Sequence, residues 1–104
     1  METAEIIKKV STAIHEIDPG AEIFLFGSRA RGDFNFDSDW DFLVLTPNEK
    51  ITFDYEMQLR EPILNIEIQS GEVISLIVYS KDDWQTNKSI SPLFCNVSKE
   101  GIKL

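Results

Sequence analysis

The sequence predicts a small α/β domain in which a mixed sheet of about three strands is covered by helices. Three apolar runs of strand length, at residues 21–26, 40–46 and 72–79, are separated by segments that carry helix and loop signals. The chain has 104 residues, of which 42% are hydrophobic, and this is enough for one modest core. We therefore expect residues 1–104 to form one domain.

The first helix is predicted at residues 2–17. One apolar stripe runs along this segment and consists of Ile6, Ile7, Val10, Ala13, Ile14 and Ile17. Such spacing is typical of an amphipathic helix, and the sequence Asp18-Pro19-Gly20 is expected to end it. The strand at residues 21–26 follows directly.

The second apolar run is predicted to be the central strand of the sheet. Its side chains are apolar on both faces, with Leu43 and Leu45 on one face and Trp40, Phe42 and Val44 on the other. A strand that is apolar on both faces is covered on both. We therefore expect Trp40 to lie in the core.

The segment at residues 51–70 has mixed signals. Its apolar residues fit helical spacing only in parts, and Pro62 is not expected to lie inside a regular helix. We predict a first turn or two, and then a helix that starts near Pro62 and closes at Gly71. The alternation of Ile66 and Ile68 leaves a short strand as the alternative.

The C-terminal part is predicted to contain a third strand and two helices. The strand covers residues 72–79, and Ser80 with Asp83 forms a capping box that opens a short helix. The dipeptide Ser91-Pro92 is expected to start a final helix, which Gly101 ends.

The composition limits the possible partners and compartments. The net charge of −8 argues against binding a long nucleic acid, which requires a basic surface. No apolar run is long enough to span a membrane and the N-terminus lacks a secretory core, so we expect a cytoplasmic protein. Cys95 is the single cysteine, and its apolar neighbours predict a small core residue rather than a reactive thiol.

A candidate phosphate-binding loop follows the first strand. Gly27 and Ser28 come directly after the apolar run, where small residues let the backbone approach a ligand closely. Ser28 is expected to open a short helical turn whose free N–H groups attract phosphate. Arg29 and Arg31 lie beside this loop and are candidates to bind the same phosphates, although a surface salt bridge is the alternative for either.

A candidate metal site lies at the start of the second strand. Asp39 and Asp41 are two residues apart, so their side chains point the same way, about 7 Å apart along the strand. Two carboxylates on one face repel each other unless a cation lies between them, and Mg²⁺ is usually held by one or two carboxylates with substrate phosphates. Taken separately, Gly27-Ser28 could form an ordinary turn, and the aspartates could belong to a solvated loop. The spacing of the two motifs between two buried strands favours a nucleotide site.

The same residues resemble those of a known family. The pattern Gly-Ser-x-Ala-Arg-Gly…Ser-Asp-x-Asp is matched by Gly27, Ser28, Ala30, Arg31, Gly32, Ser38, Asp39 and Asp41. It resembles the nucleotidyltransferases of the DNA polymerase β superfamily, and most of all the minimal nucleotidyltransferases (MNT) that are paired with HEPN proteins in toxin–antitoxin systems. The resemblance is specific over residues 23–45 and implies the nucleotidyltransferase fold.

The resemblance implies an activity and a partner. The expected reaction is the Mg²⁺-dependent transfer of a nucleotidyl group, AMP from ATP, to a hydroxyl on a HEPN toxin, with a tyrosine as the leading acceptor. One alternative is an antitoxin that acts by binding alone, and another is a small-molecule nucleotidyltransferase. A homo-oligomer and a hetero-oligomer both remain open.

One position departs from the family pattern. Polymerase β-type transferases generally carry a third carboxylate on a neighbouring strand, but the centre of the third predicted strand has none. Ser75 is its only polar side chain, and burying a hydroxyl without a partner is costly, so we predict that Ser75 faces Asp39 and Asp41. Transfer should then be slow or depend on another base, for which Glu67 and Glu72 are the nearest in sequence.

Overall fold

A computed structural model describes residues 3–35, 37–87 and 92–104 of the chain. The elements in chain order are α1 (Thr3–Ile17), β1 (Glu22–Phe26), α2 (Ser28–Arg31), β2 (Trp40–Thr46), α3 (Phe53–Ser70), β3 (Ile74–Ser80), α4 (Lys81–Asn87), α5 (Pro92–Glu100) and β4 (Ile102–Lys103).

The sheet has four strands in the order β3-β2-β1-β4, with β2 inside it as predicted. β1 runs antiparallel to β2 and to β4, whereas β2 and β3 are parallel and are connected through α3. The predicted mixed sheet is confirmed. The prediction of about three strands missed β4, because two residues that pair with Phe24 and Leu25 at the sheet edge carry no strand signal of their own.

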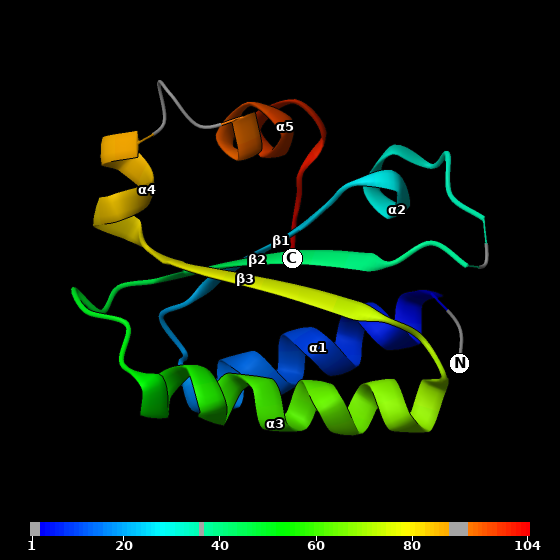
Figure 1. The fold of residues 1–104 in the computed structure, drawn as a ribbon, viewed down its shortest axis with the longest axis horizontal. Coiled ribbons are helices and arrows are strands. Elements are labelled where there is room, and N and C mark those ends of the chain that lie inside the picture. The colour runs from blue at the N-terminus through cyan, green and yellow to red at the C-terminus, as the bar shows by residue number, and fades with distance from the viewer. Residues whose placement is uncertain (1–2, 36, 88–91) are drawn as a thin grey trace.

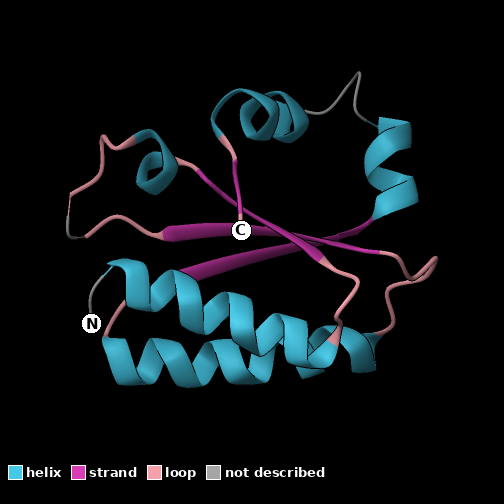
Figure 2. Ribbon diagram, turned by 180° about the vertical axis from the view of Figure 1, so that it is seen from behind, coloured by secondary structure: helices cyan, strands magenta, loops and turns pink. Residues whose placement is uncertain are grey.

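Helices cover both faces of the sheet. Figures 1 and 2 show α1 and α3 on one face, and α4 and α5 on the other. The first face packs the larger apolar cluster, in which Trp40, Phe42 and Val44 contact the two long helices; the second face packs Leu43 and Leu45 against Trp84 and Val97. Trp40 is 1% exposed, as expected for a core residue.

α3 corrects the prediction for residues 51–70. It is one helix that continues through Pro62, so neither the predicted start at Pro62 nor the alternative strand is present. Thr52 caps its first turn by accepting a hydrogen bond from the Tyr55 N–H at 3.1 Å. Burial of Leu59, Ile63 and Ile66 against the sheet offsets the cost of about 3 kcal/mol that proline imposes inside a helix.

The C-terminal helices agree with the predicted start and stop signals. The Ser80 hydroxyl accepts a hydrogen bond from the Asp83 N–H at 3.0 Å, as the capping box predicts. α5 begins at Pro92 and ends just before Gly101, whereas Ser91 lies outside the described residues. Cys95 is exposed, which corrects its predicted core position, because α5 turns Val97 and not Cys95 toward the sheet.

Among the described residues, none of the helices combines the length and the apolar character needed to cross a membrane.

Candidate active site

The candidate site forms where β1 ends beside the start of β2. Phe26 pairs with Asp41 in the antiparallel register, so Gly27, the next residue, lies against the Asp41 carboxylate. Gly27 has a φ of +76°, and a Cβ at this position would collide with the Asp41 carboxylate. Glycine is therefore required here both by the backbone conformation and by the space available.

The loop after Gly27 is a single helical turn. The N–H groups of Ala30 and Arg31 both donate to the Gly27 carbonyl, at 3.1 and 3.0 Å. Gly32 ends the turn in the left-handed conformation, with φ of +87°, and its N–H donates to the Ser28 carbonyl at 2.9 Å. The turn holds the half-buried Ser28 next to the end of β1.

Asp39 and Asp41 form an acidic pair at this edge of the sheet. Asp39 is exposed just before β2, and Asp41 is half-buried as the second residue of β2. Burial raises the pKa of the Asp41 carboxyl above its ordinary value, and the negative charge of Asp39 raises it further, while Arg31 has the opposite effect. A bound cation would relieve this repulsion.

The donor set fits a Mg²⁺ ion that arrives with a phosphate ligand. In the part of the chain that the structure describes, no group of three or more His, Cys, Asp or Glu side chains is placed to hold a metal ion. Two carboxylates are sufficient for Mg²⁺ when substrate phosphates and water complete its shell.

The two predicted arginines have different surroundings. Arg31 is 46% exposed beside the loop and pairs with Asp33 and with Glu100. The Arg29 side chain is only 6% exposed, and its guanidinium lies 4.4 Å from the ring centres of both Phe34 and Trp40.

Arg29 therefore supports the loop that carries Asp39. Its Nε and Nη2 donate to the Ser38 carbonyl at 3.3 and 3.1 Å, and it pairs with Glu72 at 3.5 Å. This placement argues against the predicted role of Arg29 in binding phosphate. The sequence alone could not predict this supporting role of Arg29, because the residues that contact its side chain lie further along the chain.

Ser75 lies beside Asp41. The two residues pair in the parallel register of β2 and β3, and residues in register point to the same side of a sheet. Ile77 and Tyr79, which alternate with Ser75, pack in the same cluster as Leu43. The half-buried Ser75 hydroxyl is therefore on the Asp41 side of the sheet, where a carboxylate on β3 would reach the acidic pair.

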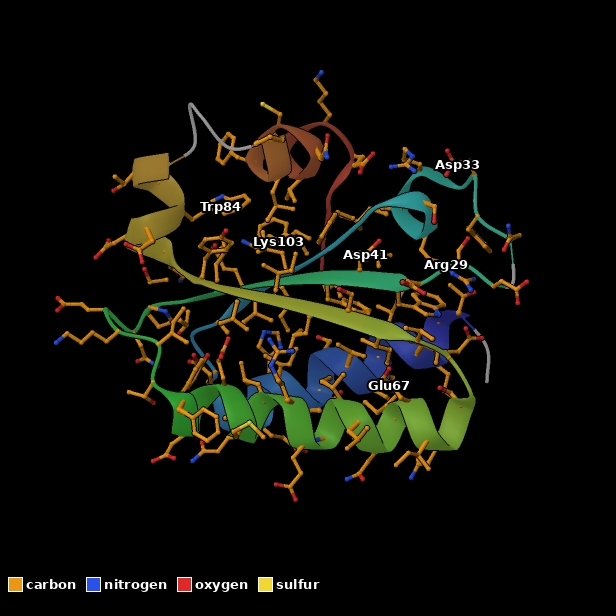
Figure 3. All side chains as sticks on the ribbon, in the orientation of Figure 1. Arg29, Asp33, Asp41, Glu67, Trp84 and Lys103 are labelled. Carbon is orange, nitrogen blue, oxygen red and sulfur yellow. The ribbon has the colours of Figure 1, made fainter. Side chains whose placement is uncertain are left out.

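The two acidic residues suggested as replacement bases are engaged elsewhere. Glu67 accepts a hydrogen bond from the Ile74 N–H at 3.0 Å. Figure 3 shows it on the α3 side of the sheet, opposite Asp41. Glu72 pairs with Arg29. The structure does not bring Glu67 to the acidic pair.

Sequence reasoning missed one residue of the site. The Glu100 carboxylate, at the end of α5, accepts a hydrogen bond from the Gly27 N–H at 3.1 Å and pairs with Arg31 at 2.9 Å. Glu100 is 73 residues from Gly27 in the chain, and no local motif marks it.

A groove of about 580 Å³ between α1 and α3 is separate from this site. Its walls include Lys8, Thr12, Pro62 and Gln69, and neither Gly27 nor Asp41 lines it. The acidic pair and the glycine loop place the chemistry elsewhere.

The sequence is similar to those of known proteins. A sequence model of the nucleotidyltransferase domain matches residues 7–103. The putative protein adenylyltransferase MJ0604 of Methanocaldococcus jannaschii is 40% identical over 81 residues, which cover 77% of this chain and 73% of that protein. The putative protein adenylyltransferase MJ0141 of the same organism is 35% identical over 83 residues, which cover 78% of this chain and 83% of that protein.

Solved structures have a similar fold at low sequence identity. The crystal structure of a toxin–antitoxin with AMP-PNP has a TM-score of 0.62 and 20% identity, over 98% of this chain and 72% of that one. A putative nucleotidyltransferase from Sulfolobus solfataricus also has a TM-score of 0.62, with 22% identity, over 95% of this chain and 76% of that one.

Proposed function

Because this chain belongs to the nucleotidyltransferase domain family, we propose that it transfers AMP from ATP to a hydroxyl group of a partner protein in a Mg²⁺-dependent reaction. The observation that carries this proposal is the contact between the glycine loop and the acidic pair. Gly27 lies against the Asp41 carboxylate, so a phosphate on the loop would be adjacent to a cation held by Asp39 and Asp41.

The residues of the site have distinct proposed roles. Gly27 and Ser28 bind the phosphates, Arg31 offsets their charge, and Asp39 with Asp41 holds Mg²⁺. Bound Mg²⁺ supplies positive charge that orients the α-phosphorus and neutralises the charge developing on the pyrophosphate leaving group. Arg29 keeps the loop before Asp39 in place through the Ser38 carbonyl.

The close approach of Gly27 gives a first test. Gly27→Ala should abolish ATP binding in calorimetry, because a Cβ would displace the Asp41 carboxylate. The left-handed φ should also cost roughly 1–3 kcal/mol of unfolding free energy.

Gly32→Ala is the matched control. Gly32 also has a positive φ, but a Cβ there meets nothing within 4 Å. The Gly32→Ala variant should lose a similar amount of unfolding free energy to the Gly27→Ala variant, but it should keep the ATP affinity of the wild-type chain. Equal ATP binding by both variants would mean that the close contact between Gly27 and Asp41 is not needed to bind ATP.

A HEPN-type protein is the proposed acceptor partner, and its tyrosine the proposed acceptor. The M. jannaschii relatives are named protein adenylyltransferases, and one solved structure of similar fold is a toxin–antitoxin. Both names support a protein acceptor over a small molecule. Recovery of a small helical protein encoded beside this chain, in a pulldown, would support it further.

An exposed apolar stripe on α3 supports a protein partner. The stripe consists of Phe53, Met57, Leu64 and Ile68, which are 76, 46, 55 and 72% exposed. Their spacing places all four on one side of the helix, and such a patch marks interaction sites. With a net charge of −8, the chain favours a basic partner over a second copy of itself.

Partner binding should therefore depend on the α3 stripe and on salt. Ile68→Ser in α3 should weaken binding of the HEPN-type partner about tenfold, or ~1.4 kcal/mol. The affinity of the wild-type chain should also fall as ionic strength rises. Gln69→Ser, next to the stripe and lining the groove with α1, is the control. Equal losses in both variants, or affinity that is indifferent to salt, would place the partner elsewhere.

An antitoxin that acts by binding alone is the second candidate. It is favoured by Ser75, which stands beside Asp41 where a third carboxylate would lie. Incubation of the protein pair with ATP labelled in the α-phosphate separates the two functions, because only the enzyme leaves label on the partner.

A further inference from the structure

Glu100 occupies two groups that the proposed function assigns to phosphate. One carboxylate oxygen accepts the hydrogen bond of the Gly27 N–H at 3.1 Å, and both oxygens contact Arg31 Nη1, at 3.1 and 2.9 Å. These are the interactions by which an N–H group and a guanidinium bind a phosphate oxygen. The Gly27 N–H has a single proton, so it cannot serve the carboxylate and a phosphate fully at the same time.

The position of Glu100 is set by the fold. Glu100 is the last residue of α5, and the N–H of the following residue, Gly101, donates to the carbonyl of the buried Val97 at 2.7 Å. After Gly101 the chain joins the sheet as β4, beside β1. The Glu100 side chain is 16% exposed, against 46% for Arg31. The carboxylate is therefore anchored at the loop, whereas the arginine can turn toward solvent or a ligand.

The charge of Glu100 opposes an anionic ligand. Its negative charge acts on Asp41, and it pairs with Arg31, an exposed cation beside the loop. A triphosphate must therefore compete with Glu100 for the single Gly27 N–H and for Arg31 Nη1.

From these contacts we infer that Glu100 is an internal competitor for the phosphates of ATP and lowers the affinity of the site for the nucleotide. The inference rests on the proposed function, since it assumes that the phosphates bind at Gly27 and Arg31. The opposite role, in which Glu100 holds Arg31 ready for the phosphate, predicts the opposite sign for the same substitution.

Calorimetric titration with ATP and Mg²⁺ tests the inference. Glu100→Gln removes the charge at nearly constant shape and should lower the Kd about tenfold. Glu100→Asp keeps the charge but withdraws it by one methylene, and it should also tighten binding. Asp33→Asn is the control, because Asp33 pairs with Arg31 on the exposed side at 3.1 Å and does not contact Gly27 in any described hydrogen bond. It should change the Kd much less.

The outcomes separate the inference from the proposed function. Tighter ATP binding by both Glu100 variants, with unchanged thermal unfolding, supports competition. Weaker or unchanged binding in variants of a protein that does bind ATP overturns the inference and leaves the proposed function in place. Absence of ATP binding in the wild-type chain and in all variants contradicts both.

Discussion

We expect that replacing Asp39 and Asp41 together by Asn abolishes the Mg²⁺-dependent binding of ATP and leaves the fold intact. The acidic pair is the proposed set of metal ligands, and a neutral amide is a much weaker ligand for Mg²⁺. We expect a loss of at least about 100-fold in ATP affinity measured with Mg²⁺, or ~2.7 kcal/mol.

The same substitutions should not reduce stability. The pKa of the Asp41 carboxyl is raised above its ordinary value of 3.8, which applies in the unfolded chain. Ionisation of this carboxyl therefore costs more free energy in the folded chain than in the unfolded chain. The stability of the wild-type chain therefore falls as the pH rises from the unfolded value through the raised pKa, and the cost is fully present above the raised pKa. Removing the charge should keep or raise the unfolding temperature at pH 7.

The stability advantage of the double variant should disappear at acid pH. Below the pKa of the unfolded carboxyl, Asp41 is protonated in both states and contributes no difference. Unchanged ATP affinity in the double variant, measured with Mg²⁺, would rule out the proposed metal site. A large loss of stability at pH 7 would mean that the carboxylates support the fold.

Ser75→Asp should raise the activity of the enzyme. The parallel register places residue 75 beside Asp41, so the new carboxylate would join the acidic pair on the same side of the sheet. We expect Mg²⁺ to bind about tenfold more tightly and the transfer rate to rise by roughly 10- to 100-fold, because a third carboxylate adds a metal ligand and a base.

Ser75→Asn is the control for Ser75→Asp, because it adds similar volume without charge. It should leave metal affinity and rate unchanged. Without Mg²⁺, Ser75→Asp should unfold at a lower temperature than Ser75→Asn, since a third negative charge increases repulsion in the site. Equal rates for the two variants would mean that residue 75 does not act on the metal site.

The sequence was most informative where the structure depends on local spacing. The segment from Gly27 to Asp41 connects two antiparallel strands that are neighbours in the sheet. The glycine loop at the end of β1 and the acidic pair at the start of β2 therefore lie side by side. The alternation of residues along β2 placed Trp40 in the core and Asp41 on the opposite face. Membership of the nucleotidyltransferase family was recognised from this stretch and is confirmed.

Features that depend on distant contacts were not predictable in the same way. Glu100 reaches Gly27 only because α5 and β4 return to the edge of β1. Arg29 is held by the rings of Phe34 and Trp40, so its side chain serves the loop and is nearly buried. Pro62 is tolerated because tertiary burial of one side of α3 outweighs its local preference.

The most direct test of the proposed reaction is the transfer of label from ATP labelled in the α-phosphate to the HEPN-type partner. We expect the partner to acquire AMP on a hydroxyl when Mg²⁺ is present, and we expect labelling to be lost with a chelator or with the Asp39→Asn, Asp41→Asn double variant. A bound pair that leaves the partner unlabelled, or labelling that persists in the double variant, would contradict it.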